Sequence, residues 1–149
     1  MNEIDDIYTD LIMEHATFSP YKKHIDNASA SMHGHNPNCG DDITLQIVSD
    51  GKIIVDIAYT GTGCAISQSS TSIMIETLIG KTLPQAKTII QTYLKMIKRE
   101  KLTPKQLDVL QNAIAFENIS NMPNRVKCAT MPWHTMQDLL NQINKLLSK

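Results

Sequence analysis

The sequence lacks a strong excess of charge of either sign. Its 14 lysines and arginines nearly balance 15 aspartates and glutamates, and the formal net charge is −1. Proteins that bind nucleic acid or an anionic membrane through their surface charge usually carry a basic excess. The composition therefore argues against nucleic acid and membranes as partners, so a partner has to be inferred from a specific site.

Long apolar runs are also absent. No stretch approaches the roughly 18 apolar residues of a membrane-spanning helix. The first residues, MNEIDDIYTDL, are acidic where a secretory leader would be basic and then apolar. We therefore expect a cytoplasmic protein. Its 149 residues fit one domain, residues 1–149, with no linker or internal repeat that would divide them.

Cysteine is scarce, and its spacing excludes the commonest uses of the residue. The three cysteines, Cys39, Cys64 and Cys128, are an odd number, lie far apart and form no C-x-x-C pair. This arrangement does not suit a disulfide framework, but it does suit a metal site or a reactive thiol. Composition alone favours the simpler interpretation that they are inert, buried apolar residues.

The periodicity of the sequence predicts an α+β fold. Apolar residues recur at helical spacing over residues 4–15, whereas residues 18–41 show no sustained period and are predicted to form a long loop. Alternating residues 43–47 and 53–59 flank an Asp-Gly pair, which predicts a β-hairpin. Helices are expected at 65–78, at 82–99, from 103 and at the C-terminal end. Strands followed by helices indicate a small antiparallel sheet with helices packed on one face.

Cys39 lies in a stretch that can place a thiol and a carboxylate beside the same atom. In HNPNCGDD, residues 35–42, Cys39 and Asp41 are two positions apart around Gly40. Residues i and i+2 of an extended chain point to the same side, and glycine supplies conformational freedom between them. The pair therefore has the geometry of a chelate.

Cys64 and Cys128 occur in settings that favour a thiolate over a thiol. Cys64 ends the stretch TGTGC just before a helix expected from about Ala65, so its sulfur would lie at the positive end of the helix dipole. Cys128 is flanked by Arg125 and Lys127, and we expect it at the start of the last helix. Three thiolates and one carboxylate can complete a tetrahedral zinc site. A shell that contains one carboxylate should release a ligand more readily than a shell of four thiolates.

Three stretches together resemble the motifs of SufU/IscU-type iron–sulfur cluster assembly proteins. They are NPNCGD at 36–41, GTGCAISQSS at 61–70 and RVKCATMPWHTM at 125–136, in the order and at the spacing of that family. The resemblance covers essentially the whole chain and implies an α+β domain with a metal site at one tip. It implies Cys39, Asp41, Cys64 and Cys128 as metal ligands, zinc as the metal and a transient iron–sulfur cluster as a further cofactor.

Two departures from the IscU pattern favour the SufU branch. Lys127 replaces a histidine before the last cysteine, and MPNRVK stands where IscU-type proteins have a Leu-Pro-Pro-Val-Lys chaperone-binding stretch. The helical segment at 98–116 also resembles an insertion typical of SufU. This branch implies a pyridoxal-phosphate-dependent cysteine desulfurase of the SufS type as the partner, with other Suf proteins as further partners. Arg125 and Lys127 would contact the partner or stabilise a thiolate.

The resemblance leaves three functions to be separated. The first is a zinc-dependent, sulfurtransferase-like acceptor of persulfide sulfur, the second a scaffold on which a cluster is built, and the third a structural zinc module. Asp41 favours the first, because sulfur transfer needs an exchangeable metal shell. We favour Cys39 as the acceptor, since it lies in a loop rich in Asn, Pro and Gly, whereas Cys64 and Cys128 are expected at helix starts. Cys128 is the rival acceptor.

The remaining polar residues carry weaker expectations. His33 and His35 lie near Cys39 and are second-choice ligands. The Gly-Thr-Gly at 61–63 is too short a signal for a phosphate-binding loop, and strand termination explains it equally well. No histidine is linked to a cysteine by a motif, which disfavours a Cys-His hydrolase. Pro132 would kink a helix that began before it, or mark where the helix begins.

Overall fold

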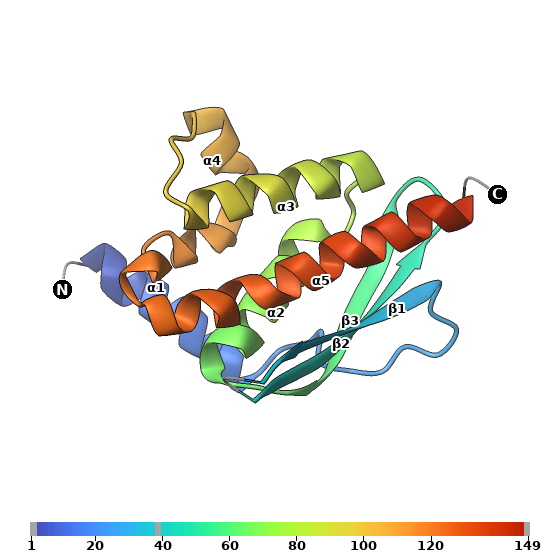
Figure 1. The fold of residues 1–149 in the computed structure, drawn as a ribbon, viewed down its shortest axis with the longest axis horizontal. Helices are drawn as coiled ribbons and strands as arrows, with labels where there is room; N and C mark the ends of the chain where they lie inside the picture. The colour runs from blue at the N-terminus through green and yellow to red at the C-terminus, as the bar shows by residue number, and fades with distance from the viewer. Residues whose placement is uncertain (1–2, 38–39, 148–149) are drawn as a thin grey trace.

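The predicted α+β fold is present in a computed structural model, which describes residues 3–37 and 40–147 (Figure 1). Its helices and strands are, in chain order, α1 (Glu3–Thr17), β1 (Ala30–Asn36), β2 (Asp41–Ser49), β3 (Ile54–Thr62), α2 (Ala65–Leu78), α3 (Leu83–Ile97), α4 (Pro104–Leu110) and α5 (Pro123–Leu147). Two short 3-10 helices, η1 (Gln111–Phe116) and η2 (Ile119–Asn121), connect α4 to α5.

Two helices begin with the same pattern, a capping threonine followed by a proline. Thr82 caps α3 and Thr103 caps α4, and each has a proline in the first helical turn. In both cases the threonine hydroxyl accepts from the backbone three residues on, where a glutamine side chain reaches back to the cap. These capping boxes satisfy backbone groups that a helix end otherwise leaves unpaired.

The sheet has three antiparallel strands in the order β1-β2-β3. The predicted hairpin of β2 and β3 turns at Asp50, whose carboxylate accepts from the backbone N–H groups of Lys52 and Ile53 at 2.9 and 2.8 Å. These hydrogen bonds hold the pKa of Asp50 below its usual range. The turn thereby sets the pairing of β2 with β3, in which alternate residues of β2 point to opposite faces of the sheet.

The expectation of one continuous loop over 18–41 is wrong, because β1 forms within it and pairs with β2 along its whole length. Gly34, in the middle of β1, explains why the strand was not recognised. A Cβ atom at this position would collide with Thr135 Oγ1 and lie 2.8 Å from Met131 Sδ on α5. Glycine therefore permits the close approach of β1 to α5, but it weakens the strand pattern in the sequence.

The segment before β1 runs along the free edge of β3. Residues 21–23 pair with the free edge of β3, where Tyr59 N–H donates to Tyr21 O at 3.0 Å and Lys23 N–H donates to Tyr59 O at 3.1 Å. Further along, the Gln46 side chain exchanges hydrogen bonds with the backbone of Ile25 at 2.8 and 2.9 Å. The irregular segment thus protects a sheet edge that would otherwise offer unpaired backbone groups.

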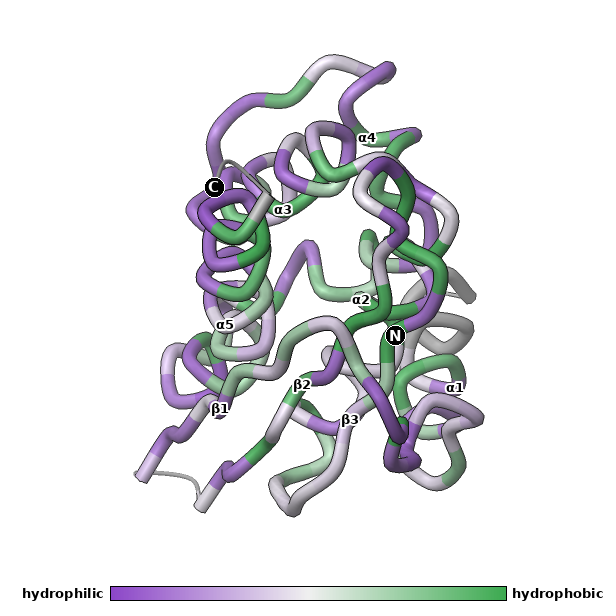
Figure 2. Tube along the Cα trace, turned by 90° about the vertical axis from the view of Figure 1, so that its right-hand side faces the viewer, coloured by the Kyte–Doolittle hydropathy of each residue, from purple (hydrophilic) through white to green (hydrophobic). Residues whose placement is uncertain are grey.

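Helix α2 lies at the centre of the fold, where it packs against α1, α5, η1 and β3 (Figure 2). It is buried although its first half is rich in serine and threonine. Several of the hydroxyls are satisfied within the helix, as shown by Ser69, which donates to Ala65 O at 2.7 Å, and Thr71, which donates to Ser67 O at 2.7 Å. Small side chains with such internal hydrogen bonds allow close packing without leaving these hydroxyls unsatisfied.

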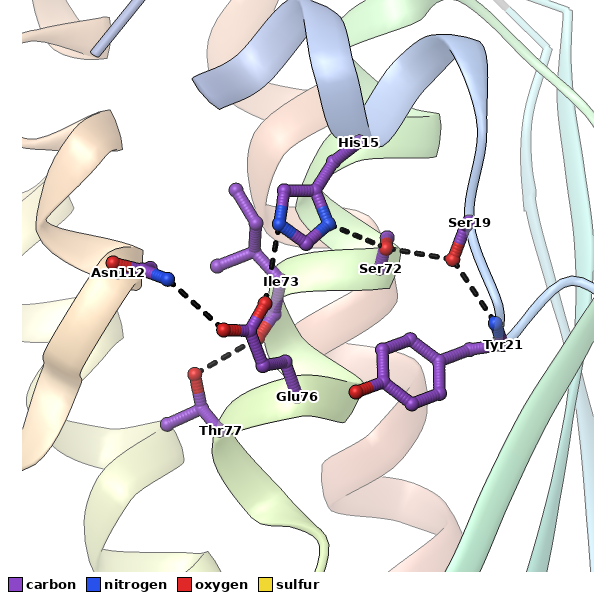
Figure 3. A network of polar contacts seen from close by, with 8 residues as sticks. All are labelled: His15, Ser19, Tyr21, Ser72, Ile73, Glu76, Thr77 and Asn112. Carbon is purple, nitrogen blue, oxygen red and sulfur yellow. Dashed lines mark hydrogen bonds and ion pairs between the residues drawn. The ribbon is translucent and has the colours of Figure 1, made fainter. Parts of the chain in front are cut away.

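Polar contacts attach α1 to α2 (Figure 3). His15 lies between Ser72 and Glu76 of α2, with its Nδ1 2.7 Å from Ser72 Oγ and its Nε2 3.1 Å from Glu76 Oε2. Asn112 of η1 donates to the other oxygen of Glu76 at 2.9 Å, and Ser19 meets Ser72 at 2.7 Å. His15 therefore has a structural role, because it joins α1 to α2.

Helix α5 begins at Pro123 and continues through Pro132. A proline at 132 cannot donate to the carbonyl four residues earlier, which belongs to Cys128. Next to this interruption, the carbonyl of Ala129 accepts from Ser70 Oγ at 2.7 Å and from Tyr93 OH at 2.9 Å. Side chains of α2 and α3 thus anchor α5 where its own hydrogen bonding is weakened. Among the residues that the structure describes, no helix is long and apolar enough to cross a membrane.

Candidate metal centre

Three residues from three separate elements meet at one end of the sheet. Asp41 begins β2, Cys64 precedes α2, and Cys128 lies in α5. One potential ligand atom from each lies within 4.8 Å of the other two. Residues separated by as many as 87 positions in the chain are therefore brought to one place, as the sequence motifs lead one to expect.

Asp41 is fully buried, and its two carboxylate oxygens have different environments. Oδ1 accepts from the backbone N–H of Cys64 at 3.0 Å and from the hydroxyl of Ser67 at 2.9 Å. Oδ2 is also buried, but it accepts no hydrogen bond from any residue that the structure describes. A buried carboxylate oxygen in that state is costly unless a cation or another donor satisfies it.

Cys64 is the N-cap of α2, as predicted from the sequence. Its sulfur accepts from the backbone N–H of Ser67 at 3.5 Å, in the position where a serine or aspartate oxygen would cap an ordinary helix. The positive end of the α2 dipole thus points towards both the thiol and Asp41. Ser67 contacts both, because its hydroxyl lies 3.8 Å from the sulfur of Cys64.

Cys128 does not lie at a helix start, in contrast to the expectation from the sequence. It is the sixth residue of α5, which begins at Pro123, and it is fully buried. Tyr93 and Trp133 stack beside this part of α5 with their ring centroids 3.7 Å apart, and Trp133 Nε1 donates to Ser70 Oγ at 3.0 Å. Packing and side-chain donors therefore position this thiol, rather than the first turn of a helix.

The Gly-Thr-Gly before Cys64 has a packing role. A Cβ at Gly63 would lie 2.8 Å from Asp41 Oδ1 and would also collide with Ser67 Oγ. At Gly61 φ is +116°, and a Cβ would collide with the carbonyl of Asp42. The two glycines thus let β3 and the start of α2 approach Asp41 closely, which accounts for them without a phosphate ligand.

The other residues predicted for the site do not all lie near this group. Cys39 lies outside the described residues. Arg125 and Lys127 are exposed on α5, where Lys127 lines a groove with His35 of β1. His33 and His35 are exposed on the sheet face opposite to the one where Asp41 is buried, so they are not brought to the thiols.

Ser67 and Asn36 are additional polar residues of the site that the sequence reasoning missed. Ser67 lies three positions after Cys64, which is where an N-capping residue finds its backbone donor. Asn36 lies opposite Asp41 in the β1–β2 register, and its Nδ2 is buried without a hydrogen-bond partner among the described residues. The N3 position after a capping cysteine was a usable signal for Ser67, whereas Asn36 requires the register of the unrecognised strand.

The chemistry of the three donors suits a thiophilic divalent metal. Two thiolates and a carboxylate are ligands that zinc accepts at tetrahedral sites. The unpartnered Oδ2 of Asp41 is the atom left available for an ion, because Oδ1 is held by Cys64 and Ser67. The residues present therefore fit zinc, with room in a four-ligand shell for one more donor.

The fold and site together define an α+β protein with two thiols and a carboxylate gathered at one end of the sheet. The family described as NifU-like N terminal domain matches residues 7–129, so the chain belongs to this family.

Individual relatives agree with this assignment. The chain is 31% identical over 139 residues to the iron–sulfur cluster assembly scaffold protein IscU of Thermotoga maritima, covering 93% of this chain and 96% of that protein. It is 32% identical over 134 residues to the zinc-dependent sulfurtransferase SufU of Bacillus subtilis, covering 90% and 89%. The crystal structure of FiSufU from Fervidobacterium islandicum, assigned to iron–sulfur cluster assembly in the SUF system, superposes with a TM-score of 0.84 at 38% identity, covering 91% and 97%.

Proposed function

We propose that this protein serves iron–sulfur cluster assembly as a zinc-dependent acceptor of sulfur from a cysteine desulfurase. The observation that carries the proposal is the grouping of Asp41, Cys64 and Cys128 within 4.8 Å around a buried, unpartnered carboxylate oxygen. The relative named as a zinc-dependent sulfurtransferase supports the acceptor role, and the relatives named as assembly scaffolds support iron–sulfur cluster assembly as the process.

Asp41, Cys64 and Cys128 would hold zinc, with Cys39 as the fourth ligand. When bound, zinc would hold the thiols deprotonated and protected from oxidation. Ser67 and the backbone N–H of Cys64 fix Asp41 through Oδ1, so that Oδ2 stays directed to the ion without rearrangement of the carboxylate. One carboxylate among thiolates makes the shell easier to open than a four-thiolate shell.

Cys39 is the residue that we propose as the sulfur acceptor. Its thiolate would attack the outer sulfur of a cysteine persulfide on the donor protein, so that a new S–S bond forms on Cys39 while the donor's S–S bond breaks. The donor cysteine leaves as a thiolate, and the proton on the transferred sulfur moves with it or is lost to solvent. The exchange needs no external oxidant or reductant, because one sulfane sulfur moves between two thiols.

The surroundings of the other two thiols support this choice. Cys128 is fully buried, and Cys64 is half-buried and held by the backbone N–H of Ser67. Access is required for thiol–disulfide exchange. The described residues that flank Cys39, Pro37 and Gly40, are exposed. Cys128 is the rival acceptor, and its burial means that the site would have to open before it reacts.

The partner that we propose is a pyridoxal-phosphate-dependent cysteine desulfurase of the SufS type. Arg125 and Lys127 are exposed on α5, within three residues of Cys128, and suit a contact surface around the site. Arg125→Glu should reduce stimulation of the desulfurase if this surface is used. Lys52→Glu makes the same charge change in the exposed β2–β3 turn, at the end of β2 away from Asp41, and should leave stimulation unchanged.

Persulfide mapping tests the proposal. The zinc-loaded protein is incubated with desulfurase and cysteine, trapped with a thiol-alkylating reagent and analysed by peptide mass. We expect the additional sulfur on the peptide that contains Cys39, with no transfer by Cys39→Ser. Persulfide on Cys128 but not on Cys39, or full turnover by Cys39→Ser, would contradict the assignment. Zinc binding without any sulfur transfer would indicate a structural zinc module.

A cluster scaffold is the second candidate, because two relatives of high coverage are assigned to scaffold function. The same donors would then hold a cluster as cargo. Anaerobic incubation with iron, cysteine and desulfurase distinguishes the two functions. A stable cluster bound in stoichiometric amount would favour the scaffold, whereas persulfide without a bound cluster would favour the acceptor.

We further propose that residues 1–149 work as one domain in which 98–116 is an insertion of the SufU type. The segment holds α4 and η1. It lies inside the range matched by the family, and the identities of 31% to IscU and 32% to SufU do not by themselves separate the two branches. Deletion of 99–116 with a short linker should reduce desulfurase stimulation more than zinc binding, because the metal ligands lie on other elements.

A further inference from the structure

The outer face of the sheet carries a group of side chains that the proposed function does not use. His33 and His35 of β1 are exposed, and they lie opposite Thr44 and Asp42 of β2 in the strand register. His33 Nε2 contacts Asp42 Oδ1 at 2.6 Å. The two imidazole rings are stacked, with centroids 6.1 Å apart and an angle of 19° between their planes. Two imidazoles and a carboxylate thus project from the same face.

We propose that His33, His35 and Asp42 form a second binding site for a divalent first-row transition metal ion. A His-x-His pair on a strand places both imidazoles on one face, about 6.6 Å apart along the chain. A carboxylate from the neighbouring strand completes three donors, which leaves further positions for water. Imidazole and carboxylate together suit zinc, nickel and iron(II) in this arrangement.

Metal binding would require the ring of His35 to turn towards Asp42. His33 already touches the carboxylate, whereas the ring of His35 stands parallel to that of His33. Both histidines are exposed, so rotation of the His35 ring into the site is not opposed by packing, and such rotations take picoseconds to nanoseconds. The donors are held on two paired strands rather than on a loop, which preserves their spacing.

This second site lies back to back with the first. Asp41 and Asp42 are consecutive in β2, and their burial shows that they point to opposite faces of the sheet, Asp41 inward and Asp42 outward. The two metal ions would therefore share no ligand. A metal on the outer face would link β1 to β2 at the end of the sheet from which Asp41 projects. The second site does not depend on the proposed function, because its donors are distinct from those at the thiols.

A second exposed histidine–carboxylate pair provides a matched control. His24 and Asp26 approach to 3.4 Å, and His24 has no second histidine two positions away. His134 provides another control, since it lines the same groove as His35 but projects from α5. Substitution of either should have little effect if His33, His35 and Asp42 are the ligands.

Calorimetric titration of the zinc-loaded full chain with Ni²⁺ tests the site. We expect one nickel to bind in addition to the resident zinc. His33→Gln or His35→Gln should weaken this binding at least about tenfold. Substitution of a residue that only contacts a metal ligand already lowers metal affinity by about that factor. His24→Gln and His134→Gln should leave it unchanged. In imidazole NMR spectra, Ni²⁺ should broaden the resonances of His33 and His35 first.

Three results would overturn the inference. The first is the absence of an additional nickel on the wild-type protein. The second is an affinity that falls equally in the His24→Gln or His134→Gln control, which would indicate scattered surface binding or a different set of donors. The third is release of one zinc for each nickel bound, which would place the nickel at the thiols. The zinc that stays with the protein is counted separately by elemental analysis, and none of these results depends on whether the protein accepts sulfur.

Discussion

Ser67 donates its hydroxyl to Oδ1 of Asp41 at 2.9 Å, whereas Oδ2 of the same carboxylate is buried without a partner among the described residues. The serine is on α2 and the aspartate on β2, so the contact links two of the elements that form the site. It orients the carboxylate before any metal arrives, which is the role that residues around metal ligands usually have.

Ser67→Ala should therefore weaken zinc binding by about 10- to 100-fold while the protein stays folded. Competition with a chromogenic zinc chelator measures the change. Ser69→Ala is the matched control, because the Ser69 hydroxyl bonds only to carbonyls of its own helix. Equal zinc affinity in the two variants would show that Ser67 does not position Asp41.

Ser70→Ala should lower the stability of the fold. The Ser70 hydroxyl joins Trp133 Nε1 to the carbonyl of Ala129, and its loss leaves a buried indole N–H unsatisfied. We expect a decrease of about 1–3 kcal/mol in the free energy of unfolding, measured by urea denaturation. Ser69→Ala should cost less in the same experiment, because the helix carbonyls that lose the Ser69 hydroxyl keep their backbone donors. A Ser70→Ala protein as stable as wild type would mean that α5 is not anchored through this hydroxyl.

Gly34→Ala should destabilise the contact between β1 and α5 by about 1–3 kcal/mol, because the added methyl group overlaps Thr135 and approaches Met131. A second substitution, Thr135→Ala, removes the group in closest conflict. The double variant should therefore be less destabilised than the sum of the two single variants. Strict additivity would show that Thr135 does not cause the conflict.

Burial raises the pKa of Tyr93. The folded protein therefore retains the phenolic proton above the pH, about 10, at which an unfolded tyrosine loses it. The associated stability is complete below about pH 10 and is lost as the pH rises towards the folded-state pKa. Wild type should lose stability above pH 10 more steeply than Tyr93→Phe in urea denaturation. Parallel losses in the two proteins would contradict the assignment.

The sequence was sufficient for most of the fold and for the proximity of three predicted site residues. Apolar periodicity and the Thr-Pro starts located the helices, and the Asp-Gly turn located the hairpin. The three motifs identified Asp41, Cys64 and Cys128 as neighbours. These features are local patterns or motifs shared by the members of a family, and they can therefore be recognised without a three-dimensional structure.

The features that the sequence did not predict depend on tertiary contacts. Strand β1 looks like a loop because Gly34 is required by α5, more than 90 residues later in the chain. Cys128 was expected at the start of the last helix, and Pro132 was expected to kink that helix or to mark its beginning. The helix continues through this proline, where Ser70 and Tyr93 hold the adjacent carbonyl of Ala129. Neither long-range contact leaves a local pattern.

Zinc content of single variants tests the central claim most directly. Asp41→Ala, Cys64→Ala and Cys128→Ala are purified beside Asp56→Ala, which removes a carboxylate of β3 that pairs with Lys23. We predict about one tightly bound zinc per chain in wild type and in Asp56→Ala, loss of tight zinc in both cysteine variants, and weakened zinc in Asp41→Ala. Stoichiometric, tightly held zinc in Cys64→Ala or Cys128→Ala would contradict the proposed metal centre.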